Sequence, residues 1–122
     1  RSSKEDQKMW FANLSLSLTE KYGGQCVIGR MYPAWEYKRE SELRPCFDAV
    51  HKEFYGTCAN FASIHAGLEC GIFYEKKPEL DMISIGPDMR DIHTPNESLN
   101  VESAIRFYKF IEKLVERIAL EK

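Results

Sequence analysis

Hydrophobic residues recur at helical spacing in three long segments of the chain. Near the start, Ser2 and Glu5 form a capping-box pattern, an apolar repeat follows, and glycines at 23–24 supply a stop. This pattern predicts a first helix of about five turns. Ser41 is placed to cap a second helix that ends at Gly56. The expected buried stripe of that helix is Leu43, Phe47, Val50 and Phe54.

The most regular repeat lies in the last segment, where Asn100 is placed to cap a helix. Its expected buried face is Val101, Ala104, Ile105, Tyr108, Ile111, Val115 and Ile118. On the outer face, the spacing predicts the ion pairs Glu102–Arg106 and Lys113–Glu116.

Shorter apolar runs predict strands over residues 25–32, 60–65 and 80–86. Residues 67–75 predict a short helix, and residues 87–100 predict a polar loop. Helices and strands therefore alternate along the chain. This order is typical of an α/β fold in which helices pack on a sheet.

Composition narrows the function classes. The chain has 122 residues, of which 43% are hydrophobic, so it is long enough for one modest domain. Its 17 Lys and Arg against 19 Asp and Glu give no reason to expect nucleic acid or a membrane as a partner. The four cysteines form no CxxC pair, so we interpret them as reduced thiols of an intracellular protein. Because the sequence does not begin with Met, we expect a processed form or a piece of a longer chain.

Two loops carry residues suited to a binding site. In open α/β sheets, ligands bind beyond the carboxyl ends of the strands. The two loops begin at such ends, one after His65 and the other after residue 85. If the two strands are parallel neighbours, His65, Glu69, His93 and Glu97 gather near one cleft.

Each of these residues also has a plain structural interpretation. Spacing alone favours a solvated loop histidine at His93 over a metal ligand. His65 could equally be a core-edge histidine bonded to the backbone, and Glu69 could simply complement the dipole at a helix start. Gly67 would let backbone N–H groups approach a ligand closely.

Longer motifs resemble a known family. "HAGLECGIF" at 65–73 and "LDMISIGPDMRDIHTPNESLNVES" at 80–103 resemble the aminoacyl-histidine (Xaa-His) dipeptidases of the dizinc M20 peptidase clan. "YPAWEY" at 32–37 is similar to the return of that family's chain from its lid into its catalytic domain. The resemblance covers essentially the whole sequence. It implies a C-terminal fragment, with residues 1–32 ending the lid or dimerisation domain and residues 33–122 finishing the catalytic α/β domain.

The resemblance also implies site residues. His93 matches the last zinc ligand, in the family's "GAHSPDE"-like motif, although Asp91, Ile92 and Asn96 depart from that motif. The "HAGLECG" residues His65, Gly67 and Glu69 match a motif that faces the substrate cleft. Arg1 matches a lid arginine that holds the substrate carboxylate.

The implied parent is a cytosolic enzyme with two zinc ions that hydrolyses Xaa-His-type dipeptides. The family's catalytic base and most of its metal ligands have no counterpart here, so the fragment alone is expected to be inactive and to hold no zinc. Because lids of this family often dimerise, the resemblance is compatible with a homodimer. The alternative is a stand-alone, non-catalytic α/β domain that binds a protein partner. An HxD motif followed later by paired glutamates, encoded upstream of Arg1, would decide for the peptidase, and a start codon just before Arg1 would decide for the binding domain.

Overall fold

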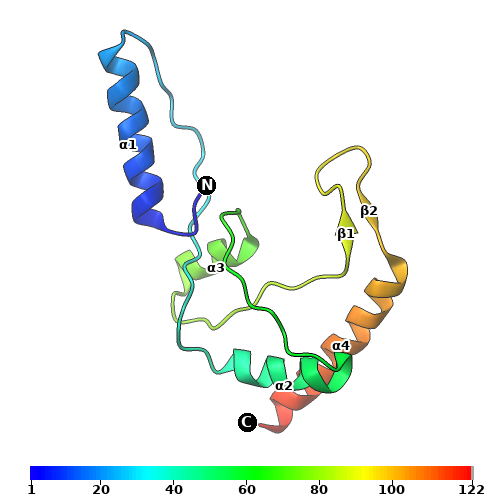
Figure 1. Ribbon diagram of the computed structural model, residues 1–122. Helices are drawn as coiled ribbons and strands as arrows, with labels where there is room; N and C mark the ends of the chain where they lie inside the picture. The colour runs from blue at the N-terminus through cyan, green and yellow to red at the C-terminus, as the bar shows by residue number, and fades with distance from the viewer. Residues whose placement is uncertain (122) are drawn as a thin grey trace. The chain divides into compact units, whose positions relative to one another are not determined.

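The computed structural model describes residues 1–121. Lys122, the last residue of the segment 33–122 that is expected to finish the catalytic domain, lies outside the described residues. The elements, labelled in Figure 1, are α1 (Glu5–Lys21), α2 (Leu43–Tyr55), α3 (Glu69–Lys76), β1 (Met89–Arg90), β2 (Ser98–Leu99) and α4 (Val101–Leu120). None of these helices combines the length and the apolar character needed to cross a bilayer.

The chain divides into two compact units. Unit 1 consists of Arg1–Glu40 and Phe61–Met82 and contains α1 and α3. Unit 2 consists of Ser41–Asn60 and the described residues from Ile83 onward, and contains α2, α4 and both strands.

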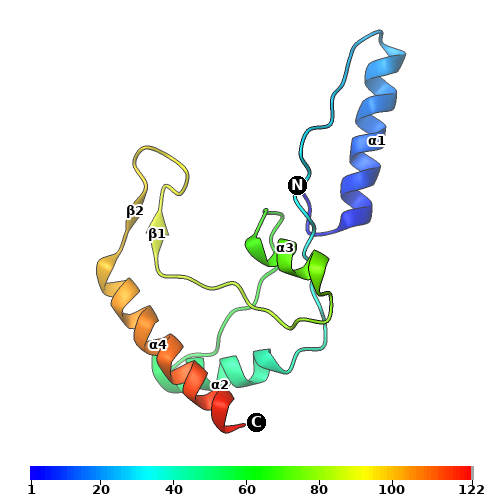
Figure 2. The ribbon, with the colours of Figure 1, turned by 180° about the vertical axis from the view of Figure 1, so that it is seen from behind.

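Unit 2 is built on the packing of α2 against α4, which cross in both Figure 1 and Figure 2. Phe47 and Val50 of α2 are buried, as are Phe110 and Leu114 of α4. The rings of Phe47 and Phe110 meet edge to face, with 5.2 Å between their centroids. Two predicted ends are confirmed: Gly56 closes α2 with a φ of 78°, and the Asn100 side chain accepts a hydrogen bond from a backbone N–H in the first turn of α4. At the start of α2 the residue before the helix is Glu42 rather than the predicted Ser41, although the Ser41 hydroxyl accepts a hydrogen bond from the Arg44 N–H at 3.0 Å.

The buried face of α4 is not the predicted one. Val101, Ile105, Tyr108 and Val115 are 66%, 54%, 66% and 58% exposed. The buried residues of α4 are instead Ser103, Phe110 and Leu114. α4 has apolar residues on two sides, and the aromatic stripe of α2 selects the side that offers Phe110 and Leu114. The predicted pair Glu102–Arg106 is present at 3.9 Å, but Lys113 pairs with Glu53 of α2 at 3.5 Å rather than with Glu116.

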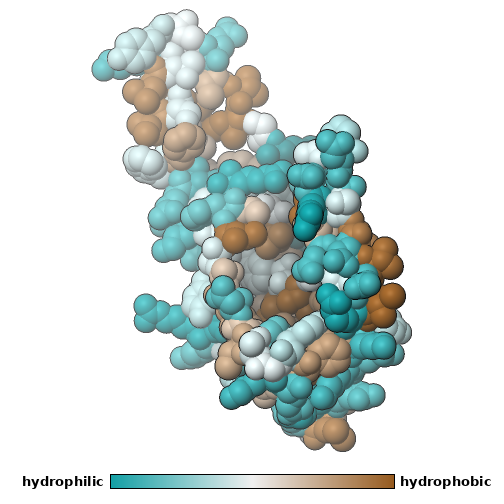
Figure 3. All heavy atoms as spheres, turned by 45° about the vertical axis from the view of Figure 1, so that its right-hand side comes forward, coloured by the Kyte–Doolittle hydropathy of each residue, from teal (hydrophilic) through white to brown (hydrophobic). Residues whose placement is uncertain are grey.

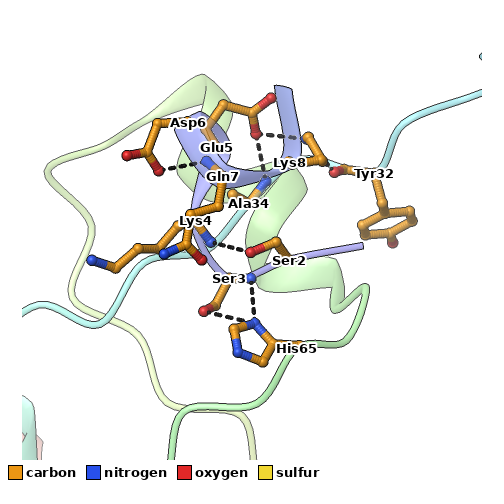
Figure 4. Close-up of polar contacts among 10 residues, drawn as sticks. All are labelled: Ser2, Ser3, Lys4, Glu5, Asp6, Gln7, Lys8, Tyr32, Ala34 and His65. Carbon is orange, nitrogen blue, oxygen red and sulfur yellow. Dashed lines mark hydrogen bonds and ion pairs between the residues drawn. The ribbon is translucent and has the colours of Figure 1, made fainter. Parts of the chain in front are cut away.

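Unit 1 is held differently. α1 buries none of its residues, and Figure 3 shows hydrophobic side chains on its surface in the upper part of the view. Its first turn is clamped to residues 32–34 by polar contacts (Figure 4). The Glu5 carboxylate accepts from the Ala34 N–H at 3.2 Å, and the Lys8 ammonium lies 2.6 Å from that carboxylate and donates to the Tyr32 carbonyl at 2.8 Å.

The predicted capping box is therefore wrong. Lys4 precedes the first residue of α1, and the Ser2 hydroxyl accepts a hydrogen bond from the Lys4 N–H instead of capping the helix. Glu5 cannot reach back to Ser2 because its carboxylate is engaged with Lys8 and Ala34.

The predicted strands over 25–32, 60–65 and 80–86 are also absent from the described chain (Figure 2). An apolar run becomes a strand only when a neighbouring strand accepts and donates its backbone hydrogen bonds. The single ladder in residues 1–121 joins β1 to β2.

Candidate functional site

Arg1 and Gly67 come together in unit 1 through a residue that the sequence did not single out, Tyr32. The guanidinium carbon of Arg1 lies 5.8 Å from the centre of the Tyr32 ring, which is cation–π geometry. A Cβ atom added at Gly67 would lie 3.0 Å from Cγ of Tyr32 and 3.4 Å from Cζ of Arg1. The missing side chain of Gly67 therefore makes room for the aromatic ring and the cation.

His65 lies on the same loop and is exposed. Its Nδ1 atom accepts a hydrogen bond from the Ser3 N–H at 3.1 Å, and Ser3 Oγ lies 3.3 Å from the same nitrogen (Figure 4). The histidine is thus bonded to backbone, as its plain interpretation supposed, but it is solvent-accessible rather than part of a core.

Glu69 is the first residue of α3 and is exposed, as expected for an acid at a helix start. Two residues later, a Cβ atom added at Gly71 would lie 2.7 Å from the Pro33 carbonyl oxygen, so α3 directly abuts the backbone of residue 33. Burial raises the pKa of the Cys70 thiol, and the adjacent Glu69 carboxylate raises it further. Both effects disfavour the thiolate, which is the reactive form of a cysteine side chain.

The predicted polar loop of unit 2 is a short hairpin. β1 and β2 pair antiparallel, with Met89 opposite Leu99 and Arg90 opposite Ser98. The turn between them places Asp91 and His93 at positive φ, 51° and 68°. Asx residues and histidine tolerate that region better than most residues do, so "DIHTPN" was a usable turn signal.

His93 lies in this turn with an exposed side chain. Its backbone N–H donates to the Glu97 carboxylate at 2.6 Å, and the Thr94 hydroxyl donates to the Asp91 carbonyl at 2.7 Å. Glu97 therefore fixes the shape of the turn through the backbone of His93, not through its imidazole.

The donor set limits what the chain can hold. Within residues 1–121 there is no group of three or more His, Cys, Asp or Glu side chains that could bind a metal ion. The exposed imidazole of His93 fits the role of one zinc ligand, whereas a catalytic zinc site takes about three protein ligands. His93 belongs to unit 2 and His65 and Glu69 belong to unit 1, so their meeting at one cleft stays a prediction.

Comparison with known proteins identifies the relatives. No protein-family model matches the chain. It is 30% identical over 118 residues to the cytosol non-specific dipeptidase of Escherichia coli (strain K12), a match that covers 97% of this chain and 24% of the relative. It is also similar to the crystal structure of aminoacylhistidine dipeptidase from Vibrio alginolyticus, with a TM-score of 0.74 and 31% identity. The predicted resemblance to the aminoacyl-histidine dipeptidases is confirmed.

The match to the Vibrio alginolyticus dipeptidase covers 94% of this chain and 24% of that one. The chain therefore spans about a quarter of the length of both dipeptidases. The same match confirms the α/β fold class, although the strands predicted over 25–32, 60–65 and 80–86 are not formed in these residues.

Proposed function

We propose that this chain is the C-terminal part of a cytosolic M20-type dizinc dipeptidase that hydrolyses Xaa-His-type dipeptides. The observation that carries the proposal is the match to two dipeptidases over almost the whole chain, in sequence and in fold. In this proposal residues 1–32 end a lid that can form a homodimer, and residues 33–122 finish the catalytic domain.

Arg1, His65, Gly67 and Glu69 would face the dipeptide. A guanidinium offers paired N–H donors that match both oxygens of a carboxylate, which suits Arg1 to the substrate's carboxyl end. The contact with Tyr32 restricts where Arg1 can lie, and Gly67 leaves space for both groups. Orientation of this kind lowers the entropy lost when the substrate binds.

His93 would be one zinc ligand. The hairpin and the Glu97 carboxylate fix the backbone from which its imidazole extends. Zinc, when bound in such a site, supplies a Lewis acid that polarises the scissile carbonyl and activates water. The remaining ligands and the general base would come from the part of the relatives that this chain does not match. The chain alone is therefore expected to hydrolyse no dipeptide and to bind zinc weakly or not at all.

The test is a chimera in which this chain replaces the matching segment of the Vibrio alginolyticus dipeptidase. We expect the folded chimera to hydrolyse an Xaa-His dipeptide in the presence of zinc, and we expect this hydrolysis to stop when a chelator is added. This chain alone should show no turnover. A chimera that folds and takes up zinc but cleaves no Xaa-His dipeptide would refute the proposal. Chelator-sensitive turnover by the chain alone would also refute it, because the chain would then carry a complete site.

A further inference from the structure

Two histidines of the chain use the same ring nitrogen in opposite ways. Nδ1 of His65 lies 3.1 Å from the backbone nitrogen of Ser3, and Nδ1 of His51 lies 2.7 Å from the carbonyl oxygen of Thr57. A backbone N–H can only donate a hydrogen bond, and a carbonyl oxygen can only accept one. Nδ1 of His65 must therefore be an acceptor, and Nδ1 of His51 must be a donor.

These roles determine where each neutral ring carries its hydrogen. A neutral imidazole has one N–H, on the nitrogen that is not accepting. His65 therefore carries its hydrogen on Nε2 and His51 carries its hydrogen on Nδ1. The Ser3 hydroxyl, 3.3 Å from Nδ1 of His65, can donate to the same lone pair and favours the same form.

We propose that Ser3 is a positioning residue that holds His65 as an Nε2–H hydrogen-bond donor toward an oxygen atom of a bound ligand. In Figure 4 both hydrogen bonds drawn from Ser3 run to His65, which lies 62 positions away in the sequence. The ligand-binding half of the proposal rests on the proposed function, whereas the tautomer does not.

The neighbourhood of His65 suits an oxygen ligand. Its side chain is exposed, and two residues further on Gly67 lies against the Arg1 guanidinium. A carboxylate or carbonyl oxygen accepts hydrogen bonds from a guanidinium and from a neutral imidazole N–H alike. A ring with Nδ1 already accepting and Nε2 protonated has no free lone pair for a metal, so this arrangement also separates the role of His65 from that of His93.

The tautomers can be measured on this chain as it is. Long-range proton–nitrogen NMR of the ¹⁵N-labelled protein, at a pH where its histidines are neutral, distinguishes the two forms of each ring. We expect His65 as the Nε2–H form, His51 as the Nδ1–H form, and a through-hydrogen-bond cross peak between the Ser3 amide nitrogen and Nδ1 of His65. A His65 ring with its hydrogen on Nδ1, or a missing cross peak, would overturn the proposal.

Two variants separate the backbone donor from the side chain. Ser3→Pro removes the N–H and should abolish the cross peak and populate both forms of His65, while Ser3→Ala keeps the N–H and should retain the wild-type spectrum. In the chimera, Ser3→Pro should raise KM by up to about tenfold with little change in kcat. Unchanged KM in an active Ser3→Pro chimera would overturn the ligand-binding half. A chimera that folds and takes up zinc but is inactive, together with an intact cross peak in this chain, would refute the proposed function and leave the tautomer established.

Discussion

The two units are stabilised by different interactions. In unit 2, α2 and α4 bury apolar side chains against each other, with Val50 at 0% and Phe110 at 2% exposure. In the described residues of unit 1, only Ala34 and Gly71 are buried. Unit 1 is stabilised instead by the polar contacts of Glu5 and Lys8. Neighbouring atoms also pack closely against Gly67 and Gly71.

The difference matters because most candidate substrate-binding residues lie in unit 1. Arg1, His65, Gly67 and Glu69 all belong to the unit with little buried apolar surface. Regions with few buried contacts open more readily than packed cores. The geometry of the candidate site should therefore respond to small polar changes that would leave unit 2 unaffected.

The largest effect is expected from Phe110→Ala in unit 2. Phe110 contacts the rings of Phe47, Phe54 and Tyr55, with centroids 5.2, 5.8 and 5.4 Å away. Its removal should lower the free energy of unfolding by about 3–5 kcal/mol, because it leaves a cavity among these rings. The matched control is Phe11→Ala on α1, where the ring is 65% exposed and the expected change is within about 0.5 kcal/mol. Equal losses in urea unfolding would contradict the difference between the units.

A smaller loss is expected from Gly71→Ala in unit 1. The new methyl group would lie 2.7 Å from the Pro33 carbonyl oxygen, and both partners belong to the backbone, so the start of α3 has to move. Overpacking of this kind typically costs about 1–3 kcal/mol. Gly29→Ala is the control, since no atom lies within 4 Å of its Cβ position. Hydrogen exchange of the α3 amides reports the effect, and identical exchange in the two variants would show that the contact is not constraining.

Loss of the helix cap in unit 2 should cost less again. Asn100→Ala removes the side-chain acceptor for the Ser103 N–H, 3.0 Å away, and should destabilise α4 by about 1 kcal/mol. Asn96→Ala, on the same hairpin, is the control and should change stability by less than about 0.5 kcal/mol. Thermal melting compares them. A cap variant as stable as its control would mean that α4 is held by packing alone.

The smallest effect concerns the pH dependence of the α1 clamp in unit 1. The hydrogen bond and ion pair with Lys8, and the Ala34 N–H, hold the pKa of the Glu5 carboxyl below its ordinary value of 4.5, against the opposing effect of burial. A lowered folded-state pKa means that the clamp contributes fully above the unfolded-state pKa and is lost as pH falls through the folded-state pKa. NMR of the Ala34 amide between pH 7 and pH 3 should show the Glu5 titration, and Glu5→Gln should remove it. An Ala34 shift that titrates equally in Glu5→Gln would assign the effect to another group.

Sequence patterns predicted where the helices begin and end better than they predicted which residues of the helices are buried. Asn100, Gly56 and the glycines at 23–24 mark helix ends that the structure confirms, because caps act through local backbone geometry. Which face of α4 is buried could not be read from periodicity, since apolar residues occupy two sides and the choice depends on α2. The predicted strands failed for a related reason, because a strand depends on partners far away in the sequence.

The candidate site shows the same limit. The motifs pointed to His65, Gly67 and His93. His65 lies at a bend, Gly67 is closely approached by neighbouring atoms, and His93 has a positive φ. The contacts of Ser3 with His65 and of Tyr32 with Arg1 join residues that are distant in sequence, so no local pattern indicates them.

The proposed role of His93 is tested most directly by zinc content and turnover of the chimera with His93→Asn. Asparagine tolerates the positive φ of this position and lacks the imidazole, so the fold should be kept while one zinc ligand is lost. We predict that elemental analysis shows a loss of bound zinc, that turnover of the Xaa-His dipeptide falls to a small fraction of the parent value, and that the melting temperature changes little. Full zinc occupancy with near-normal turnover would contradict the assignment of His93 as a ligand.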